Sequence, residues 1–127
     1  MSKEFVPYQP SLDMKELGFD ERCMGHYWEG LFYYQTTHSH PSTMPNSIES
    51  CSAPLYQQAF RWLLKHHNLY GVIIPTETMN WTFKTMTVVE GIVEVPPYKH
   101  VDSNDYGTPE EAEFACLIKL IEIVKNK

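Results

Sequence analysis

Apolar positions are spaced most densely near the end of the chain, where they predict a largely buried helix over residues 108–127. Thr108 can accept a hydrogen bond from the amide of Glu111, and Pro109 suits the first position of a helix. Glutamates follow in the first turn and lysines stand at the end, so both charges complement the helix dipole. Because the apolar positions cover more than one stripe, we expect this helix to pack between a sheet and another element.

Two more helices are predicted upstream from their capping residues. Ser11 is the expected N-cap of a short helix over 12–17. Ser52 is the expected N-cap of a longer helix over 54–67, and Asn68 tolerates the left-handed backbone with which that helix can stop. Apolar residues recur at helical spacing in the longer helix, which predicts one buried face and one exposed face.

Aromatic and alternating runs predict strands between these helices. Residues 22–28 and 31–34 form a predicted hairpin across Glu29 and Gly30, a pair suited to a two-residue turn. Further strands are predicted at 69–75, 80–89 and 92–95, followed by a polar loop over 99–107. The elements together predict an α+β fold, with a mostly antiparallel sheet packed by two main helices plus a short N-terminal helix.

The segment 35–52 interrupts this pattern. Its 18 residues are mostly Thr, Ser, His, Pro and Asn without periodicity, and plain connections in compact domains are rarely that long. We therefore expect a loop that is either mobile or functional. Cys51 can be exposed in this loop, whereas Cys116 is expected to be a buried, inert thiol in the last helix.

Composition predicts one globular domain over residues 1–127. The chain has 127 residues, of which 43% are hydrophobic and 20% are charged. This length and hydrophobic fraction are sufficient for a hydrophobic core. Sixteen acidic side chains against ten basic ones give a net charge of −6. This excess argues against nucleic acid as a partner, because gripping phosphates requires clustered Lys and Arg.

The same sequence features predict a cytoplasmic protein without a membrane partner. No apolar stretch reaches the roughly 18 residues of a membrane span, and the first residues lack the apolar segment of a secretory signal. The three cysteines include no closely spaced pair, which fits a reducing compartment better than a disulfide framework.

A metal site is the sharpest chemical hypothesis. One residue separates His38 from His40, so on an extended segment both imidazoles can point to one side and share a zinc ion. The candidates for a further ligand are His26, Cys23, Glu29 and Glu49. Closed zinc sites usually show four ligands at short spacing, and here the remaining alternative is a pair of exposed loop histidines. A metal-dependent hydrolase using this site is the alternative function. It ranks second because the sequence shows no complete catalytic signature and assigns no catalytic residue.

Aromatic side chains favour a binding function. In the predicted hairpin Tyr27 and Trp28 are consecutive, as are Tyr33 and Tyr34, and neighbours on a strand point to opposite faces. One face can therefore line the core while the other presents aromatic surface, unless helices cover both faces. We expect a non-enzymatic binding or accessory protein that acts through protein–protein contact, with an unknown partner or a second copy of itself.

The element order from residue 54 onward resembles that of the double-stranded-RNA-binding domain. In that family the last helix opens with lysines that lie across phosphates, whereas this chain has glutamates in the corresponding turn. The resemblance therefore implies a similar order of elements and no RNA binding.

A second resemblance covers nearly the whole chain. The stretches 5–8, 15–21, 53–62 and 110–125 look like an uncharacterised family of small proteins encoded in bacteriophages and mobile elements of gut bacteria. This resemblance implies a shared fold and a phage or mobile-element origin. It implies no activity and no site residues.

Overall fold

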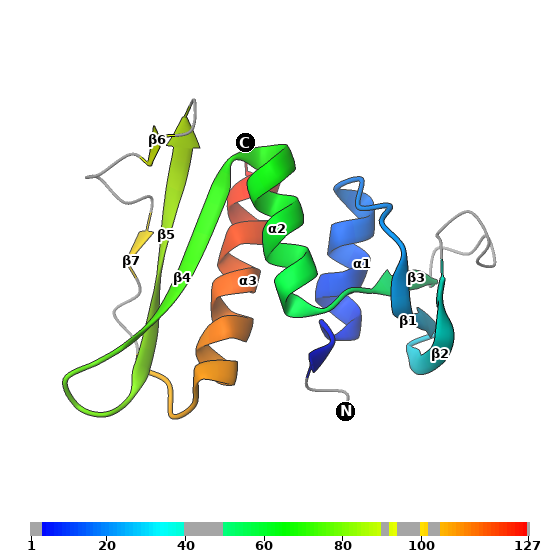
Figure 1. Cartoon of the computed structure of the whole chain (residues 1–127), viewed down its shortest axis with the longest axis horizontal. Coiled ribbons are helices and arrows are strands. Elements are labelled where there is room, and N and C mark those ends of the chain that lie inside the picture. The colour runs from blue at the N-terminus through cyan, green and yellow to red at the C-terminus, as the bar shows by residue number, and fades with distance from the viewer. Residues whose placement is uncertain (1–3, 40–49, 90–91, 94–99, 102–104, 127) are drawn as a thin grey trace. The chain divides into compact units, whose positions relative to one another are not determined.

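The computed structural model describes residues 4–39, 50–89, 92–93, 100–101 and 105–126 (Figure 1). Contacts within the chain divide it into two compact units, residues 1–59 and residues 60–127. The described residues form three helices and two antiparallel sheets, so the predicted α+β class is confirmed. Each unit holds one of the sheets, and a single domain over 1–127 stays a prediction.

The first unit is built on a hairpin. Its elements are α1 (Tyr8–Glu16), β1 (Cys23–Trp28), β2 (Leu31–Ser39) and β3 (Cys51–Ala53), and the strands form an antiparallel sheet in the order β2-β1-β3. Glu29 and Gly30 both have positive φ, at 54° and 81°, which is the backbone of the twisted two-residue turns that hairpins prefer. The predicted hairpin is thus confirmed.

The segment 35–52 is less irregular than its composition suggests. Residues 35–39 extend β2, because Ser39 pairs with Cys23 beyond an irregularity in the ladder. Residues 51–53 form β3, which pairs with β1. Residues 40–49 lie outside the described residues. The prediction of a loop is therefore wrong at both ends of the segment, where a partner strand supplies backbone hydrogen bonds that the local sequence does not signal.

Packing in the first unit centres on aromatic rings. One cluster of buried residues consists of Phe5, Tyr27, Cys51 and Ala53, with Tyr8, Leu12, Met24 and Phe32 partly buried against it. Tyr8 of α1 makes an edge contact with Tyr27, at 5.5 Å between ring centroids. The prediction of an exposed Cys51 is wrong, since β3 carries this thiol into the core.

Both upstream helices begin at residues other than those predicted. α1 starts at Tyr8 after Pro7, and Ser11 is a buried helical residue whose hydroxyl donates to the carbonyl of Val6 at 3.0 Å. α2 spans Tyr56–His67, and Ser52 lies in β3 opposite His26. Neither serine caps its helix, because the Ser11 hydroxyl is bonded to the nearby Val6 carbonyl and Ser52 is part of a strand.

The second unit is a strand pair covered by the last helix. β4 (Leu69–Pro75) pairs along its whole length with β5 (Trp81–Val89), and the short strands β6 (Ile92–Val93) and β7 (His100–Val101) also pair with β5. The predicted strands at 69–75 and 80–89 are confirmed. The predicted loop over 99–107 is wrong at β7, and residues 94–95 lie outside the described residues.

The last helix, α3 (Pro109–Lys125), packs on β4 and β5 (Figure 1). Its predicted cap is confirmed, because the amide of Glu111 donates to the Thr108 hydroxyl at 3.1 Å. Phe114 and Ile118 are exposed, so this helix is less completely covered than its apolar pattern predicts. Among the described residues, no helix is both long enough and apolar enough to span a membrane.

Candidate protein-binding site

The β1–β2 hairpin separates its side chains onto two faces. Tyr27 pairs with Phe32, and both point toward Phe5 and α1. The neighbouring pairs, His26 with Tyr33 and Trp28 with Leu31, alternate to the other side. We call these last four residues, His26, Trp28, Leu31 and Tyr33, the outer face.

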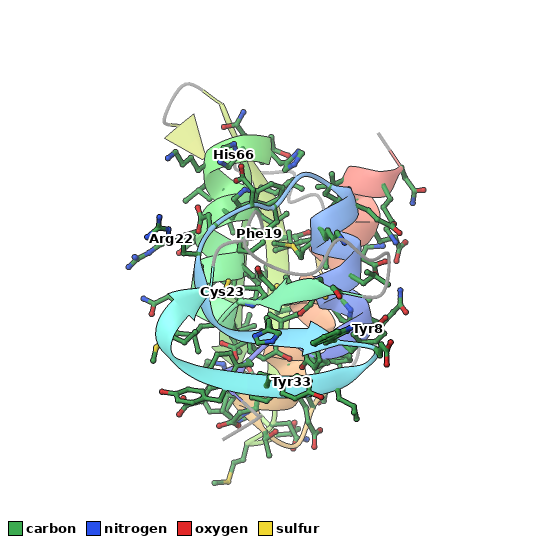
Figure 2. All side chains as sticks on the ribbon, turned by 90° about the vertical axis from the view of Figure 1, so that its right-hand side faces the viewer. Tyr8, Phe19, Arg22, Cys23, Tyr33 and His66 are labelled. Carbon is green, nitrogen blue, oxygen red and sulfur yellow. The ribbon has the colours of Figure 1, made fainter. Side chains whose placement is uncertain are left out.

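The outer face exposes large apolar side chains. Trp28 is 44% exposed, Leu31 is 63% exposed and Tyr33 is 44% exposed. Figure 2 looks onto this side of the sheet, where Tyr33 lies on β2. In the first unit α1 packs against the opposite face of the sheet, through Tyr8 and Tyr27. These three neighbouring side chains form an apolar surface in contact with water. Removing such a surface from water is favourable.

Of the four predicted binding residues, the structure exposes three. Trp28 and Tyr33 share the outer face, and Tyr34 is 48% exposed opposite Gly25, with its ring 6.2 Å from that of Phe5. Tyr27 is buried, and its hydroxyl donates to the carbonyl of Val6 at 2.9 Å. Tyr27 therefore supports the site from below and does not form its surface. Whether the exposed three bind a partner stays a prediction.

Leu31 belongs to the site although the sequence pattern did not single it out. Its exposure follows from the turn, because a two-residue turn places Leu31 opposite Trp28 and on the same face as Tyr33. Counting along the strand in steps of two from Tyr33 would have found it.

His26 is the buried member of the outer face. It is only 8% exposed, and its ring stacks on that of Tyr33 at 5.4 Å between centroids and 16° between planes. Its Nδ1 has no hydrogen-bond partner among the described residues. Burial lowers the pKa of His26 below its ordinary value, which favours the neutral ring at pH 7. The imidazole thus serves as a flat support that fixes the ring of Tyr33.

The metal hypothesis draws on residues that the structure describes only in part. The backbone of His38 lies in β2, but its side chain and the whole of His40 lie outside the described residues. Among side chains that are described, no three of the metal-binding types gather at one point. A zinc site formed by His26, His38 and His40 stays a prediction.

All three thiols are buried, and two of them are hard to ionise. Burial raises the pKa of Cys23 to about 12, with the Glu21 charge adding to the effect and the Ser52 hydrogen bond opposing it. Burial likewise raises the pKa of Cys51 to about 11. Cys116 is fully buried in α3, as predicted. A thiol must lose its proton to act as a nucleophile, so the raised pKa values of Cys23 and Cys51 argue against such a role for these two.

Charge is distributed unevenly between the units. Residues 1–59 contain seven acidic and three basic side chains, whereas residues 60–127 contain nine acidic and seven basic ones. Most of the net negative charge therefore belongs to the unit that contains the β1–β2 hairpin.

No family model, curated protein or solved structure matches this chain. The resemblance to proteins of bacteriophages and mobile elements accordingly stays a prediction.

Proposed function

We propose that this protein is a non-enzymatic binding protein that contacts another protein through the outer face of its β1–β2 hairpin. The observation that carries the proposal is the exposure of Trp28, Leu31 and Tyr33 on one face of a short sheet. Trp and Tyr combine a large apolar body with one polar group, and they are enriched among the residues that dominate protein interfaces.

The hairpin also holds these side chains in place before any partner arrives. Tyr33 rests on the ring of His26, and the turn at Glu29 and Gly30 fixes the register that brings Leu31 beside Trp28. A preformed surface loses less conformational entropy on binding than a flexible one. Because each side chain is already about half covered, burying the rest contributes on the order of 1 kcal/mol per residue.

The test compares capture of partners by matched variants. Immobilised wild-type protein, a Trp28→Ser/Tyr33→Ser variant and a Met79→Asn variant are exposed to extract from the source cell, and retained proteins are identified. Met79 is 90% exposed at a turn of the second unit, and Asn tolerates its positive φ, so this substitution removes an exposed apolar side chain elsewhere.

We expect a retained protein that the Met79→Asn variant keeps and the Trp28→Ser/Tyr33→Ser variant loses. That protein is then purified and titrated calorimetrically against all three forms. The double substitution should weaken binding by about tenfold or more, since hot-spot residues commonly contribute more than 1 kcal/mol each. Equal binding by all three forms would refute the proposed function.

A further inference from the structure

The outer edge of β2 offers backbone groups that no described strand uses. β2 is the terminal strand of the sheet ordered β2-β1-β3, so β1 covers only one of its two edges. Leu31–Ser39 contains no proline and no Asp, Glu, Lys or Arg, the residues that commonly protect an edge strand from further pairing. Nothing in the sequence of β2 therefore opposes the addition of a strand.

The register identifies which backbone groups face outward. In a hairpin, the two residues that flank a two-residue turn donate and accept a backbone hydrogen bond with each other, as Trp28 and Leu31 do here. The same pattern recurs two residues further along, so Tyr33 forms both backbone hydrogen bonds with His26. The alternate residues, Phe32 and Tyr34, consequently turn their N–H and C=O groups away from β1. Among the described residues no other backbone group pairs with them. Two donors and two acceptors thus stand in a row along this edge.

Two exposed carboxylates belong to the same unit as this row. Glu29 occupies the turn before β2, and Glu4 adjoins Phe5, whose ring contacts that of Tyr34. Neither carboxylate takes part in an ion pair within the part of the chain that the structure describes. Together with the acidic excess of residues 1–59, this arrangement favours a positively charged segment. A second copy of the chain is disfavoured as the partner, because its own net charge of −6 would be repelled by these negative charges.

The outer face supplies a second reason for a basic partner. Side chains of an added strand alternate between the two faces of the sheet, and those on the outer side would lie next to Tyr33. Lys and Arg bind favourably over the faces of Trp and Tyr rings, and both Trp28 and Tyr33 are partly open to solvent.

Resting on the binding function proposed above, we propose that β2 takes up an extended, basic segment of another protein as an additional strand of its sheet. Hydrogen bonds to the outward backbone groups of Phe32 and Tyr34 provide the part of the affinity that does not depend on the sequence of the bound segment. Contacts of Lys or Arg with Glu29, Glu4 and the aromatic outer face provide the preference for basic sequences.

The experiment titrates the full chain with a fluorescent peptide of alternating lysine and valine, read by anisotropy. Two peptide controls accompany it. One replaces lysine by glutamate, and the other carries N-methyl groups on the alternate backbone nitrogens that would face β2. We expect the lysine peptide to bind, the glutamate peptide not to bind, and N-methylation to weaken binding by about tenfold, because each lost hydrogen bond weakens it severalfold.

Variants of the protein locate the peptide on β2. Tyr34→Pro removes the outward N–H without removing a bond to β1, whereas Tyr34→Thr removes the ring and keeps that N–H. We expect about a tenfold loss for the first and less than a threefold loss for the second. Glu29→Gln should weaken binding about threefold at low salt, with less effect at high salt. The N-methylated peptide is tested on wild-type protein, so the result does not depend on folding of the proline variant.

Three results would overturn strand addition: no binding of the lysine peptide, equal binding of its N-methylated form, or equal binding of the glutamate peptide. Sedimentation that shows a dimer, made monomeric by Tyr34→Pro, would assign the edge to a second copy instead and overturn the basic partner. If the Trp28→Ser/Tyr33→Ser variant loses affinity for a natural partner but Tyr34→Pro leaves that affinity unchanged, strand addition is refuted while the binding function stands. A partner that ignores Trp28 and Tyr33 removes the binding function itself.

Discussion

Replacing Gly71 by alanine tests how closely the last helix packs on its sheet. A Cβ atom at Gly71 would lie 2.5 Å from Sγ of Cys116 and 3.2 Å from Cδ1 of Leu120. Ordinary contacts of a Cβ atom are 3.4–4 Å, so the first distance is too short by about 1 Å. Both partners are fully buried in α3, which leaves the strand and the helix to move apart.

Two effects of opposite sign act on the free energy of unfolding. Gly→Ala at a relaxed position stabilises a protein by about 0.4–1 kcal/mol, because the unfolded chain loses conformational freedom. Overpacking a well-filled core destabilises by about 1–3 kcal/mol. The short distance to Cys116 places Gly71→Ala toward the upper end of the second range. We therefore expect a net loss of about 1–2 kcal/mol.

Urea unfolding followed by tryptophan fluorescence measures this change. Gly107→Ala is the matched control, since the nearest atom to a Cβ there is 4.0 Å away and its φ is not positive. It should shift the free energy by no more than about 0.5 kcal/mol. Adding Cys116→Ala to Gly71→Ala removes the clashing sulfur, and the double variant should be at least about 1 kcal/mol more stable than additivity predicts. A Gly71→Ala variant as stable as wild type, or no coupling to Cys116, would contradict the packing described.

Three further predictions concern the helix cap, pH and metal. Thr108→Ala should lower the free energy of unfolding by about 1 kcal/mol in urea titrations, because the Glu111 amide loses its acceptor. The pKa of His26 is lowered by burial, so its neutral form contributes stability that is fully present above about pH 6.5 and is lost as the pH falls through the lowered value. Stability measured between pH 7.5 and 5 should therefore decline on acidification, and His26→Gln should flatten that decline; an unchanged slope would exclude His26 as the cause. Elemental analysis of protein purified without a metal-affinity tag should show no stoichiometric zinc, whereas one zinc per chain that vanishes in a His38→Ala/His40→Ala variant would favour the hydrolase alternative.

Parts of the fold could be predicted because the signals lie in adjacent residues. The hairpin across Glu29 and Gly30 needs only a turn that accepts positive φ and two flanking runs of strand-forming residues. The stop at Asn68, with φ of 56°, and the cap at Thr108 are equally local. The candidate site was predictable to the same extent, because the alternation of aromatic residues along a hairpin assigns them to two faces.

The failures share a physical cause. Ser11 and Ser52 are both suitable helix caps, yet one is bonded to the Val6 carbonyl and the other lies in a strand beside His26. Cys51 looks exposed in a polar sequence, but pairing with β1 turns it into the core. In each case a bond or pairing that the local pattern does not signal decided the outcome. It is the Val6 carbonyl, five residues before Ser11, in the first case, and pairing with β1 for Ser52 and Cys51.

The sequence by itself determined the α+β class, the hairpin, the capped final helix and the net negative charge of the chain. Turn geometry, capping and periodicity act over a few neighbouring positions, and net charge is a property of composition. Only the tertiary structure decided that Tyr27 is buried while Trp28, Leu31 and Tyr33 are exposed, because this depends on which face of the sheet Phe5 and α1 cover. It also decided that β2 ends the sheet, since strand order follows from long-range pairing that no local pattern contains.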